Sequence, residues 1–430
     1  MPNSIRRREF LKQTSMLAAG VSTLSGSAFA RPSTKGPNEK VLVGIIGCNG
    51  RGMAHIAGYL AEPNAEIICV CDVDSHALER GIAAVAKKQE RKAKGFKDLR
   101  QMLEIKELDA VSIATPDHWH APATILACSA GKHVYVEKPG SHNPHESELM
   151  VAAAKKHNRR AQMGNQRRSW PWVIEAIEAV KGGEIGKVFF ARAWYNNHRP
   201  SIGKGKPAPV PEWLDYSLWQ GPAPEQPYRD NILHYNWHWF WNWGTGEIGN
   251  NGVHFLDLAR WGLDVDYPRR VTCGGGRYHF DDDWQTPDTY VASFDFGDKF
   301  ISWDGQSCDP HGFENESVGV NFFGEKGCLS IAGNNCKIFD ANDKVVREIK
   351  GKGDDVLHFR NFIQAIREGE KLKSAIEDGQ KSTMLCHLGN IAVRTGQTVD
   401  FDPSTRKIKA NEKAARLWQR DYRKGWEPRV

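Results

Sequence analysis

VLVGIIGCNGRG, residues 41–52, joins an apolar, mostly β-branched run to a turn rich in glycine. Such a run is typical of a strand that is buried on both faces of a parallel sheet. Residues 53–60, which follow, are compatible with a helix. A strand, a glycine turn and a helix in this order direct backbone N–H groups and the positive end of the helix dipole at a pyrophosphate. The stretch therefore predicts a dinucleotide-binding α/β domain.

The glycine turn also indicates which residues hold the cofactor. Asn49 stands where the Gly-x-Gly-x-x-Gly pattern has its second glycine. Asparagine tolerates a left-handed backbone better than most residues, so we expect the turn to form, although the Asn49 side chain can crowd the pyrophosphate. The residues expected at the cofactor in this turn are Gly47, Asn49, Gly50, Arg51 and Gly52.

An acidic residue after the next strand favours NAD over NADP. The predicted strand 67–71 ends in Asp72, 25 residues beyond Gly47. A carboxylate at this place binds both ribose hydroxyls of NAD and repels a 2′-phosphate. No arginine directly follows Asp72 to favour NADP. A helix cap is the alternative for this acid, and Asp74 could bind the ribose instead.

Strands and helices continue to alternate through the first half of the chain. We predict strands at 109–114 and 134–136 and helices at 121–130 and 144–157. This order implies βαβ units in a doubly wound parallel sheet. Two turns, residues 115–120 and 137–139, follow strands at the edge where ligands of such sheets bind.

From residue 161 the pattern changes to that of a second domain. Helices are predicted at 171–181, 354–367 and 379–394. Strands are predicted at 188–195, 271–280, 289–296, 300–307, 319–323, 328–332 and 337–339. Turn signals between the later strands indicate hairpins in a large, open, mainly antiparallel sheet. The predicted fold is therefore a doubly wound Rossmann sheet at 40–160, then an α+β domain at 161–395 and a tail at 396–430.

Three motifs together resemble a known family. Residues 47–55, Thr115-Pro116 with His120, and Glu137-Lys138-Pro139 match the order and spacing of the Gfo/Idh/MocA oxidoreductases, which include glucose-fructose oxidoreductase and inositol dehydrogenase. The resemblance covers roughly residues 40–395. It implies that Lys138 lies beside the nicotinamide and the substrate, and that Pro139 follows a cis peptide. It also implies that Thr115, Pro116, His120 and Glu137 contribute to the cofactor site.

Lys138 is the first candidate catalytic residue. An ammonium beside a substrate hydroxyl and a cationic nicotinamide favours the alkoxide-like state from which hydride leaves, and it can relay the proton. A lysine just past a strand is otherwise a solvated end residue.

A second motif lies between residues 250 and 257. It resembles the family pattern Asp-x-Gly-x-His-x-x-Asp, in which the histidine is a general base or polariser; here His254 and Asp257 match, and Asn250 replaces the leading aspartate. An amide orients a hydroxyl but takes no proton. The resemblance thus implies that Lys138 and His254 carry the proton, while Asn250 and Asp257 orient hydroxyls.

Aromatic residues concentrate on the substrate side. Eleven of the fifteen tryptophans lie between Trp170 and Trp284, most densely in residues 234–243. If that stretch is extended, its odd-numbered residues share one face, and aromatic faces stack on sugar rings. A hydrophobic core is the alternative. No acidic or cysteine complement stands at metal-ligand spacing, so we expect no metal. Of Arg167 and Arg168, only one should face the cleft. The expected substrate contacts are Arg167, Trp237, Trp239, Asn250 and His254.

The first thirty residues predict export. Arg7-Arg8-Glu9-Phe10-Leu11-Lys12 is a twin-arginine motif, and an apolar stretch and the sequence Ala28-Phe29-Ala30 follow it. We expect residues 1–30 to be a signal peptide, 31–39 a linker, and the protein to be periplasmic or otherwise exported. A general secretory signal with extra arginines is the alternative.

Composition excludes several other classes. The formal charge is +6 over 430 residues without a long basic tract, so we expect no nucleic-acid partner. No stretch after the signal is apolar enough for a membrane span. Nine cysteines without metal-ligand spacing are expected to be buried and unpaired. The basic tail is expected to be solvated, and the open sheet could pair two subunits.

These features predict an exported NAD(P)-dependent oxidoreductase that transfers hydride to or from a sugar or polyol. Because free NAD is scarce outside the cytoplasm, we expect a tightly bound cofactor that is recycled within each cycle. One alternative is a glycosidase that oxidises a ring carbon, eliminates the aglycone, adds water and returns the hydride. Another is a noncatalytic sugar-binding protein.

Overall fold

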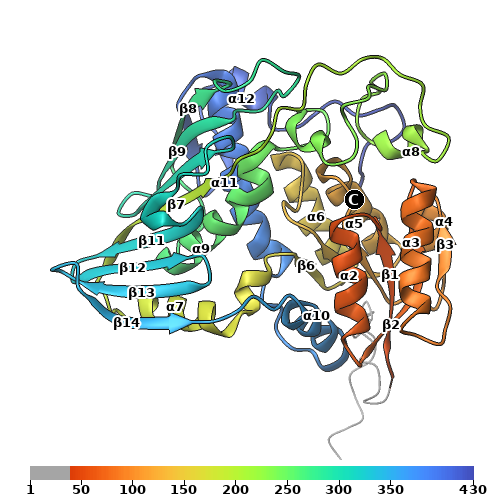
Figure 1. Ribbon diagram of the computed structural model, residues 1–430, viewed down its shortest axis with the longest axis horizontal. Coiled ribbons are helices and arrows are strands. Elements are labelled where there is room, and N and C mark those ends of the chain that lie inside the picture. The colour runs from red at the N-terminus through yellow and green to blue at the C-terminus, as the bar shows by residue number, and fades with distance from the viewer. Residues whose placement is uncertain (1–38) are drawn as a thin grey trace, which may run out of the picture. The chain divides into compact units, whose positions relative to one another are not determined.

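The computed structural model describes residues 39–430, which belong to one compact unit (Figure 1). The predicted signal peptide and most of the predicted linker lie outside the described residues. Within residues 39–430, no helix is long and apolar enough to cross a membrane. All nine cysteines fall in this range; they are unpaired, and seven of them are buried.

The first half forms the predicted doubly wound parallel sheet. Its six strands lie in the order β3-β2-β1-β4-β5-β6, so the chain reverses direction across the sheet between β1 and β4. Ligands of such sheets bind at this reversal. The strands are β1 (Val41–Ile46), β2 (Ala65–Cys71), β3 (Lys94–Phe96), β4 (Ala110–Ile113), β5 (His133–Val136) and β6 (Ala161–Met163). The helices are α2 (Arg51–Leu60), α3 (Ser75–Ala86), α4 (Leu99–Leu103), α5 (Asp117–Ser129) and α6 (Pro144–Lys156).

The first sheet extends past the boundary predicted at residue 160. Strand β6 pairs with β5 in parallel, with Val134 opposite Ala161, so it belongs to this sheet and not to the second domain. Helix α10 (Val356–Glu368) also returns to the first sheet from late in the sequence. Its Phe359, Phe362 and Ile363 share a core with Val41 on β1, and the Phe359 ring lies directly over Gly58 of α2.

The second half forms the predicted open sheet. Ten strands lie in the order β14-β13-β12-β11-β7-β10-β9-β8-β15-β16, and only β7 and β10 pair in parallel. The strands are β7 (Val188–Asn196), β8 (Arg270–Gly276), β9 (Thr289–Asp295), β10 (Phe300–Gln306), β11 (Val318–Gly324), β12 (Gly327–Ala332), β13 (Asn335–Asp340), β14 (Val345–Lys350), β15 (Val399–Asp402) and β16 (Lys407–Ile408). Helices α7 (Pro171–Lys181), α9 (Val253–Leu263) and α11 (Ile376–Thr395) pack against it.

The outer face of this sheet carries exposed apolar side chains. Val291 on β9 is 52% exposed and Phe300 on β10 is 38% exposed, and the Phe300 ring lies 6.0 Å from that of Phe190 on β7. Pairing of two subunits through this face stays a prediction.

The tail packs against the rest of the chain at several points, while most of its lysine and arginine side chains are exposed, as expected. Strand β15 adds to the second sheet, with Val399 opposite Val271, and α12 (Glu412–Arg416) follows. The tail then runs from α12 to the C-terminus near α5 (Figure 1). Arg420 forms an ion pair with Glu146 on α6 at 2.8 Å. The tail therefore contacts both halves of the chain: β15 pairs with β8, and Arg420 pairs with Glu146.

Candidate functional site

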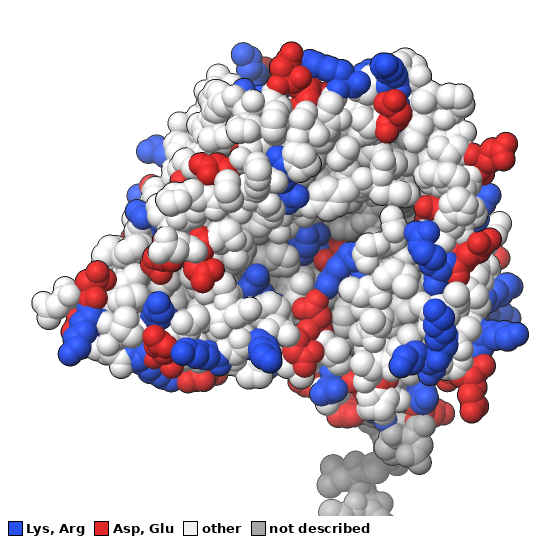
Figure 2. Space-filling model, in the orientation of Figure 1, with Lys and Arg blue, Asp and Glu red and all other residues white. Residues whose placement is uncertain are grey.

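A cavity of about 430 Å³ lies at the carboxyl edge of the first sheet. The face in Figure 2 is hollowed near its centre, with lysine or arginine side chains at the edge of the hollow. The cavity is lined by the glycine turn, the ends of β2, β4 and β5, and the aromatic loop 234–238. Most of the predicted cofactor and catalytic residues are among its walls: Gly47, Asn49, Gly50, Arg51, Asp72, Thr115, Pro116, His120, Glu137, Lys138, Trp237 and Asn250.

The glycine turn has the shape that a dinucleotide needs. Gly47 has a φ of +86°, and a Cβ there would lie 2.7 Å from the Ala114 carbonyl oxygen. A Cβ on Gly52 would lie 1.9 Å from the Gly47 carbonyl oxygen, whereas a Cβ on Gly50 would meet nothing within 4 Å. The Asn49 side chain accepts a hydrogen bond from Arg80 on α3 at 3.2 Å. The turn therefore depends on Gly47 and Gly52 and tolerates the change to Asn49.

Asp72 and Asp74 both line the cavity, so which of the two carboxylates binds the ribose stays a prediction. Asp72 accepts hydrogen bonds from the backbone N–H groups of Cys48 at 2.6 Å and Asp74 at 2.9 Å, and it lines the cavity. Burial raises the pKa of its carboxyl, and these two N–H groups oppose the shift. The Asp74 carboxylate caps α3 through His76 and contacts His234 at 3.0 Å. Both oxygens of the Asp74 carboxylate therefore have partners within the protein.

Arg51 and Glu137 are bound mainly to each other. Arg51 Nε donates to Glu137 Oε1 at 2.7 Å, and its Nη1 donates to Asp355, at the start of α10, at 2.7 Å. His55 Nε2 lies 3.0 Å from the same Glu137 oxygen. Burial opposes ionisation of Glu137, but Arg51 and His55 hold the pKa of this carboxyl well below its ordinary value. This pair positions the cavity wall.

His120 lines the cavity and also holds two of its turns together. Its Nδ1 lies 2.6 Å from the Pro139 carbonyl oxygen and its Nε2 lies 2.8 Å from that of Thr115. Both ring nitrogens are thus occupied by protein, and the ring joins the two turns that carry Thr115-Pro116 and Lys138. His120 therefore positions these two turns, and its predicted contact with the cofactor stays a prediction.

Lys138 presents its amine at the cavity. The amine donates to the backbone oxygen of Asn250 at 2.7 Å and to its side-chain oxygen at 3.3 Å. Burial lowers the pKa of the Lys138 ammonium, and the nearby carboxylates of Glu137 and Asp117 oppose this shift. The peptide bond between Lys138 and Pro139 is cis, as the resemblance implied. A buried amine with a lowered pKa is suited to proton exchange.

Asn250 is held by residues that sequence reasoning missed. It lies in the π-helical turn η3 (Ile248–Gly252), and such turns are frequent at functional sites. Its amide donates to Glu247 at 3.3 Å and to the Tyr235 hydroxyl at 3.4 Å. Glu247 is fully buried and accepts from Arg199 at 2.5 Å. In the sequence, the one sign of a role for Glu247 was its position three residues before Asn250.

His254 lies near the amine but not on the cavity wall. Burial, followed by the charges of Lys138 and Arg167, lowers the pKa of its ring well below the ordinary value. Its Nδ1 is buried and has no hydrogen-bond partner among residues 39–430. The lowered pKa favours the neutral imidazole, and the predicted contact of His254 with a substrate stays a prediction.

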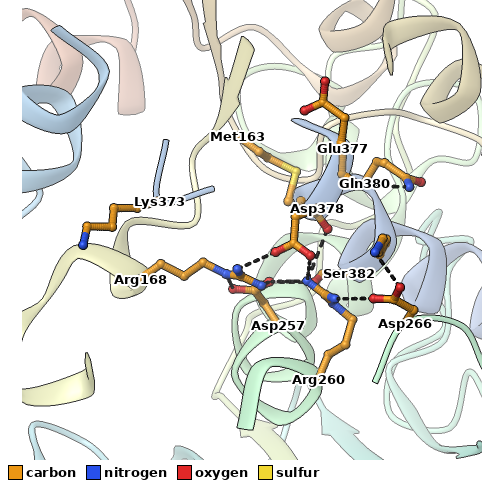
Figure 3. Close-up of polar contacts among 12 residues, drawn as sticks. Met163, Arg168, Asp257, Arg260, Asp266, Lys373, Glu377, Asp378, Gln380 and Ser382 are labelled. Atoms are coloured by element: carbon orange, nitrogen blue, oxygen red, sulfur yellow. Dashed lines mark hydrogen bonds and ion pairs between the residues drawn. The ribbon is translucent and has the colours of Figure 1, made fainter. Parts of the chain in front are cut away.

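Asp257 lies in a buried ion network, away from the cavity (Figure 3). Both of its oxygens accept from Arg168 at 2.8 Å, and one also accepts from Ser382 at 2.6 Å. Asp378 forms ion pairs with both Arg168 and Arg260. The distance between Asp378 and Arg260 is 2.8 Å. The expected role of Asp257 in orienting a hydroxyl has no support in these contacts, because its lone pairs are used by Arg168 and Ser382.

We predict that Asp257→Asn destabilises the protein by about 3–5 kcal/mol, because removing one member of a buried ion pair leaves the other unpaired. The free energy of unfolding, measured with denaturant, checks this. Asp264→Asn is the control: Asp264 pairs with Lys181 at the surface, and its loss should cost less than about 1 kcal/mol. Normal stability with lost activity in Asp257→Asn would restore its catalytic role.

Arg167, and not Arg168, is the arginine that remains for a ligand. Its guanidinium carbon lies 4.8 Å from the Trp170 ring centroid and 4.7 Å from that of Phe255. Among residues 39–430 it forms no ion pair, and burial lowers its pKa to about 10 against the effect of Asp355. Neither arginine lines the cavity, so the prediction that one of them faces a ligand stays a prediction.

The aromatic loop is not extended, so its odd-numbered side chains do not form one wall. Asn236–Trp239 is a 3-10 helix, η2. Trp237 lines the cavity and stacks on His238 with centroids 3.6 Å apart. Trp239 is only 1% exposed and stacks on Trp284 at 3.9 Å. Trp237 stays a candidate substrate contact, but Trp239 is a core residue.

Two family models match the chain. Residues 41–165 match "Oxidoreductase family, NAD-binding Rossmann fold", and residues 194–428 match "Oxidoreductase family, C-terminal alpha/beta domain". The second match alone covers more than half of the sequence. The chain belongs to the Gfo/Idh/MocA oxidoreductase family. Residues 41–165 form an NAD-binding Rossmann domain, and NAD is the cofactor.

Relatives of this oxidoreductase include proteins with a glycosidase name. "Alpha-N-acetylgalactosaminidase" of Shewanella oneidensis and "Glycosyl hydrolase family 109 protein 1" of Shewanella sp. strain ANA-3 are each 26% identical over 212 residues. That match spans 45% of this chain and 46% of each relative, so less than half of either relative's length is matched.

A solved structure shares the fold of this Gfo/Idh/MocA member. The WlbA dehydrogenase from Bordetella pertussis, in complex with NADH and UDP-GlcNAcA, superposes with a TM-score of 0.64 and 22% identity. The superposition covers 85% of this chain and 99% of the dehydrogenase. It extends across both halves and therefore confirms the arrangement of a Rossmann domain followed by an α/β domain.

Proposed function

We propose that this protein oxidises or reduces a carbon bearing a hydroxyl group on a sugar or polyol, with NAD that stays bound between turnovers. The observation that carries this proposal is the position of the Lys138 amine. It lines the same cavity as the glycine turn and Trp237, so one cavity provides a dinucleotide cradle, a proton-exchanging group and an aromatic surface.

The residues present fit the cofactor. Gly47 and Gly52 let the turn close tightly where a Cβ would clash with the backbone of Ala114 and Gly47, and Asp72 would hold the ribose. Bound NAD supplies a hydride acceptor, and its reduced form supplies a hydride donor.

The proposed roles of the other residues follow from their contacts. Lys138, whose pKa is lowered, takes the proton of the substrate hydroxyl in oxidation and returns it in reduction. Asn250 holds the amine through two oxygens and so fixes its direction. The neutral His254 ring and the unpaired Arg167 guanidinium would bind hydroxyl oxygens, and Trp237 would stack on the sugar ring.

We also propose that the protein is exported, since residues 1–30 have the twin-arginine pattern and a cleavage signal. Export removes the enzyme from the cellular NAD pool. A cofactor that is retained and restored within each cycle resolves this conflict. Restoration requires either a second substrate or the return of hydride to the first one.

A glycosidase is the second candidate, and the two named Shewanella relatives favour it. In this alternative the sugar is oxidised only transiently, so that the hydrogen beside the new carbonyl becomes acidic and the aglycone is eliminated. Addition of water and return of the hydride then release the free sugar. The same cavity residues would serve, because Lys138 handles the hydroxyl proton in both reactions.

Incubation with glycosides and free sugars in deuterated water separates these functions. For the oxidoreductase we expect an oxidised or reduced sugar and a change in nicotinamide absorbance, with no cleavage of glycosides. Release of a free sugar that carries deuterium beside the oxidised carbon, without net NADH, would show the glycosidase instead. Protein that lacks bound nicotinamide and does not respond to added NAD and sugars would contradict both.

A further inference from the structure

A second cavity, of about 300 Å³, shares no lining residue with the first. Its walls come from the start of α6, the end of α11, the tail around α12, and loop residues Pro224, 241–242 and 244–245. Each segment contributes a polar or charged side chain that the proposed reaction does not use. The lining includes Arg394, Arg416 and Arg420 but only one acidic residue, Asp421.

The charges of these arginines are poorly compensated. Among residues 39–430, neither Arg394 nor Arg416 has a carboxylate within ion-pair distance. Arg394 instead lies over the ring of Trp241, 4.6 Å from its centroid. Arg420 pairs with Glu146 through two nitrogens, but its third, Nη1, is buried without a hydrogen-bond partner.

The start of α6 adds neutral hydrogen-bonding groups. Asn143 caps this thirteen-residue helix through its side-chain oxygen, while its buried amide nitrogen lies beside the Tyr422 hydroxyl and has a second hydrogen to donate. His142 Nε2 lies 3.0 Å from the Trp241 carbonyl oxygen and therefore carries the proton, which leaves the buried Nδ1 as a free acceptor. The positive end of the α6 dipole also favours an anion.

The tail is strongly basic. Between Pro403 and Val430 it has nine lysines and arginines and three acidic residues. Two of the cavity's arginines come from the tail and one from α11, so like charges from two elements converge, and Asp421 is the one acid among the lining residues. An oxyanion placed there would pair with both elements, because guanidinium groups bind phosphate and carboxylate through paired N–H donors.

We propose that the second cavity binds a small oxyanion, a phosphate or a carboxylate, that joins the tail to helix α11. Arg394 and Arg416 provide the charge, and Arg420 Nη1 and the Asn143 amide provide buried donors. The free acceptor of His142 suits a ligand that also has a hydroxyl group, such as a sugar acid or a singly protonated phosphate. This site is separate from the proposed reaction and does not depend on it.

The test uses the full protein and two probes, inorganic phosphate and glucuronate, with sodium chloride at matched ionic strength. We expect a saturable rise in Tm with at least one probe and none with chloride. Hydrogen exchange should slow in residues 411–426 when the probe is bound. The probe that saturates at the lower concentration distinguishes phosphate from carboxylate.

The variant R394M/R416M should bind the probe at least about tenfold more weakly. The matched control K409M/K413M removes two exposed tail charges outside the cavity and should bind as the parent does. The single variant R416Q, at an exposed position, serves if the double variant does not fold. Equal weakening in the control, unchanged affinity without the cavity arginines, or no saturable binding of either probe would overturn the proposal.

Discussion

Replacing Lys138 with methionine is expected to slow hydride transfer by about 10³-fold while NAD remains bound. The substitution removes the amine that lines the cavity and donates to both Asn250 oxygens, and with it the group that exchanges the substrate proton. Loss of a positioned acid–base group typically costs 10²- to 10⁴-fold in rate. Single-turnover changes in nicotinamide absorbance measure the rate, and release of nucleotide on denaturation measures what is bound.

The control for this variant is Lys155→Met. Lys155 lies on α6, is exposed and does not line the cavity, so the same change of side chain should leave the rate within about twofold. A Lys138→Met protein that reacts at the parental rate would show that the amine takes no part in the reaction. Loss of bound NAD from this variant would instead place Lys138 in cofactor binding.

The substitution Gly52→Ala is expected to weaken NAD binding by at least about 100-fold. The new Cβ would lie 1.9 Å from the Gly47 carbonyl oxygen and 2.7 Å from its carbon, and this neighbour is backbone that cannot rotate away. The turn must therefore open, and the N–H groups that face the pyrophosphate move with it. Equilibrium titration with NAD measures the effect after bound nucleotide has been removed.

Gly131→Ala separates this effect from general strain. Gly131 has a φ of +76°, with nothing within 4 Å of its Cβ position, and it lies outside the cavity. Alanine there should cost about 1–2 kcal/mol of stability, because it adopts a left-handed conformation, and should leave NAD affinity unchanged. Unchanged NAD affinity in Gly52→Ala would contradict the assigned role of the turn.

Much of the first half was predictable because its signals are local. The run at residues 41–46, the turn at 47–52 and the acid at 72 each follow from the geometry of one strand and its turn. All three lie where expected, with Gly47 and Gly52 sterically required. The position of Lys138 came from the resemblance, and the structure adds its bonds to Asn250.

The errors arose where tertiary contacts override local pattern. The aromatic loop alternates like a strand, but Trp239 stacks on Trp284 and η2 replaces the expected extended segment. Asp257 shares a helix face with His254 in sequence, yet Arg168 and Ser382 occupy its oxygens. Neither partner is near it in the chain, so no local pattern could indicate this network.

The return of α10 to the first sheet affects when the first domain can fold during synthesis. Phe359, Phe362 and Ile363 complete the apolar layer that also contains Val41 and buries one side of the nucleotide-binding half. A ribosome must therefore have synthesised more than 360 residues before that layer can close. Until then the nascent first domain presents unburied apolar surface, and a chaperone has a binding site for most of translation. The apolar layer behind the NAD-binding half is thus completed only after most of the polypeptide has been made.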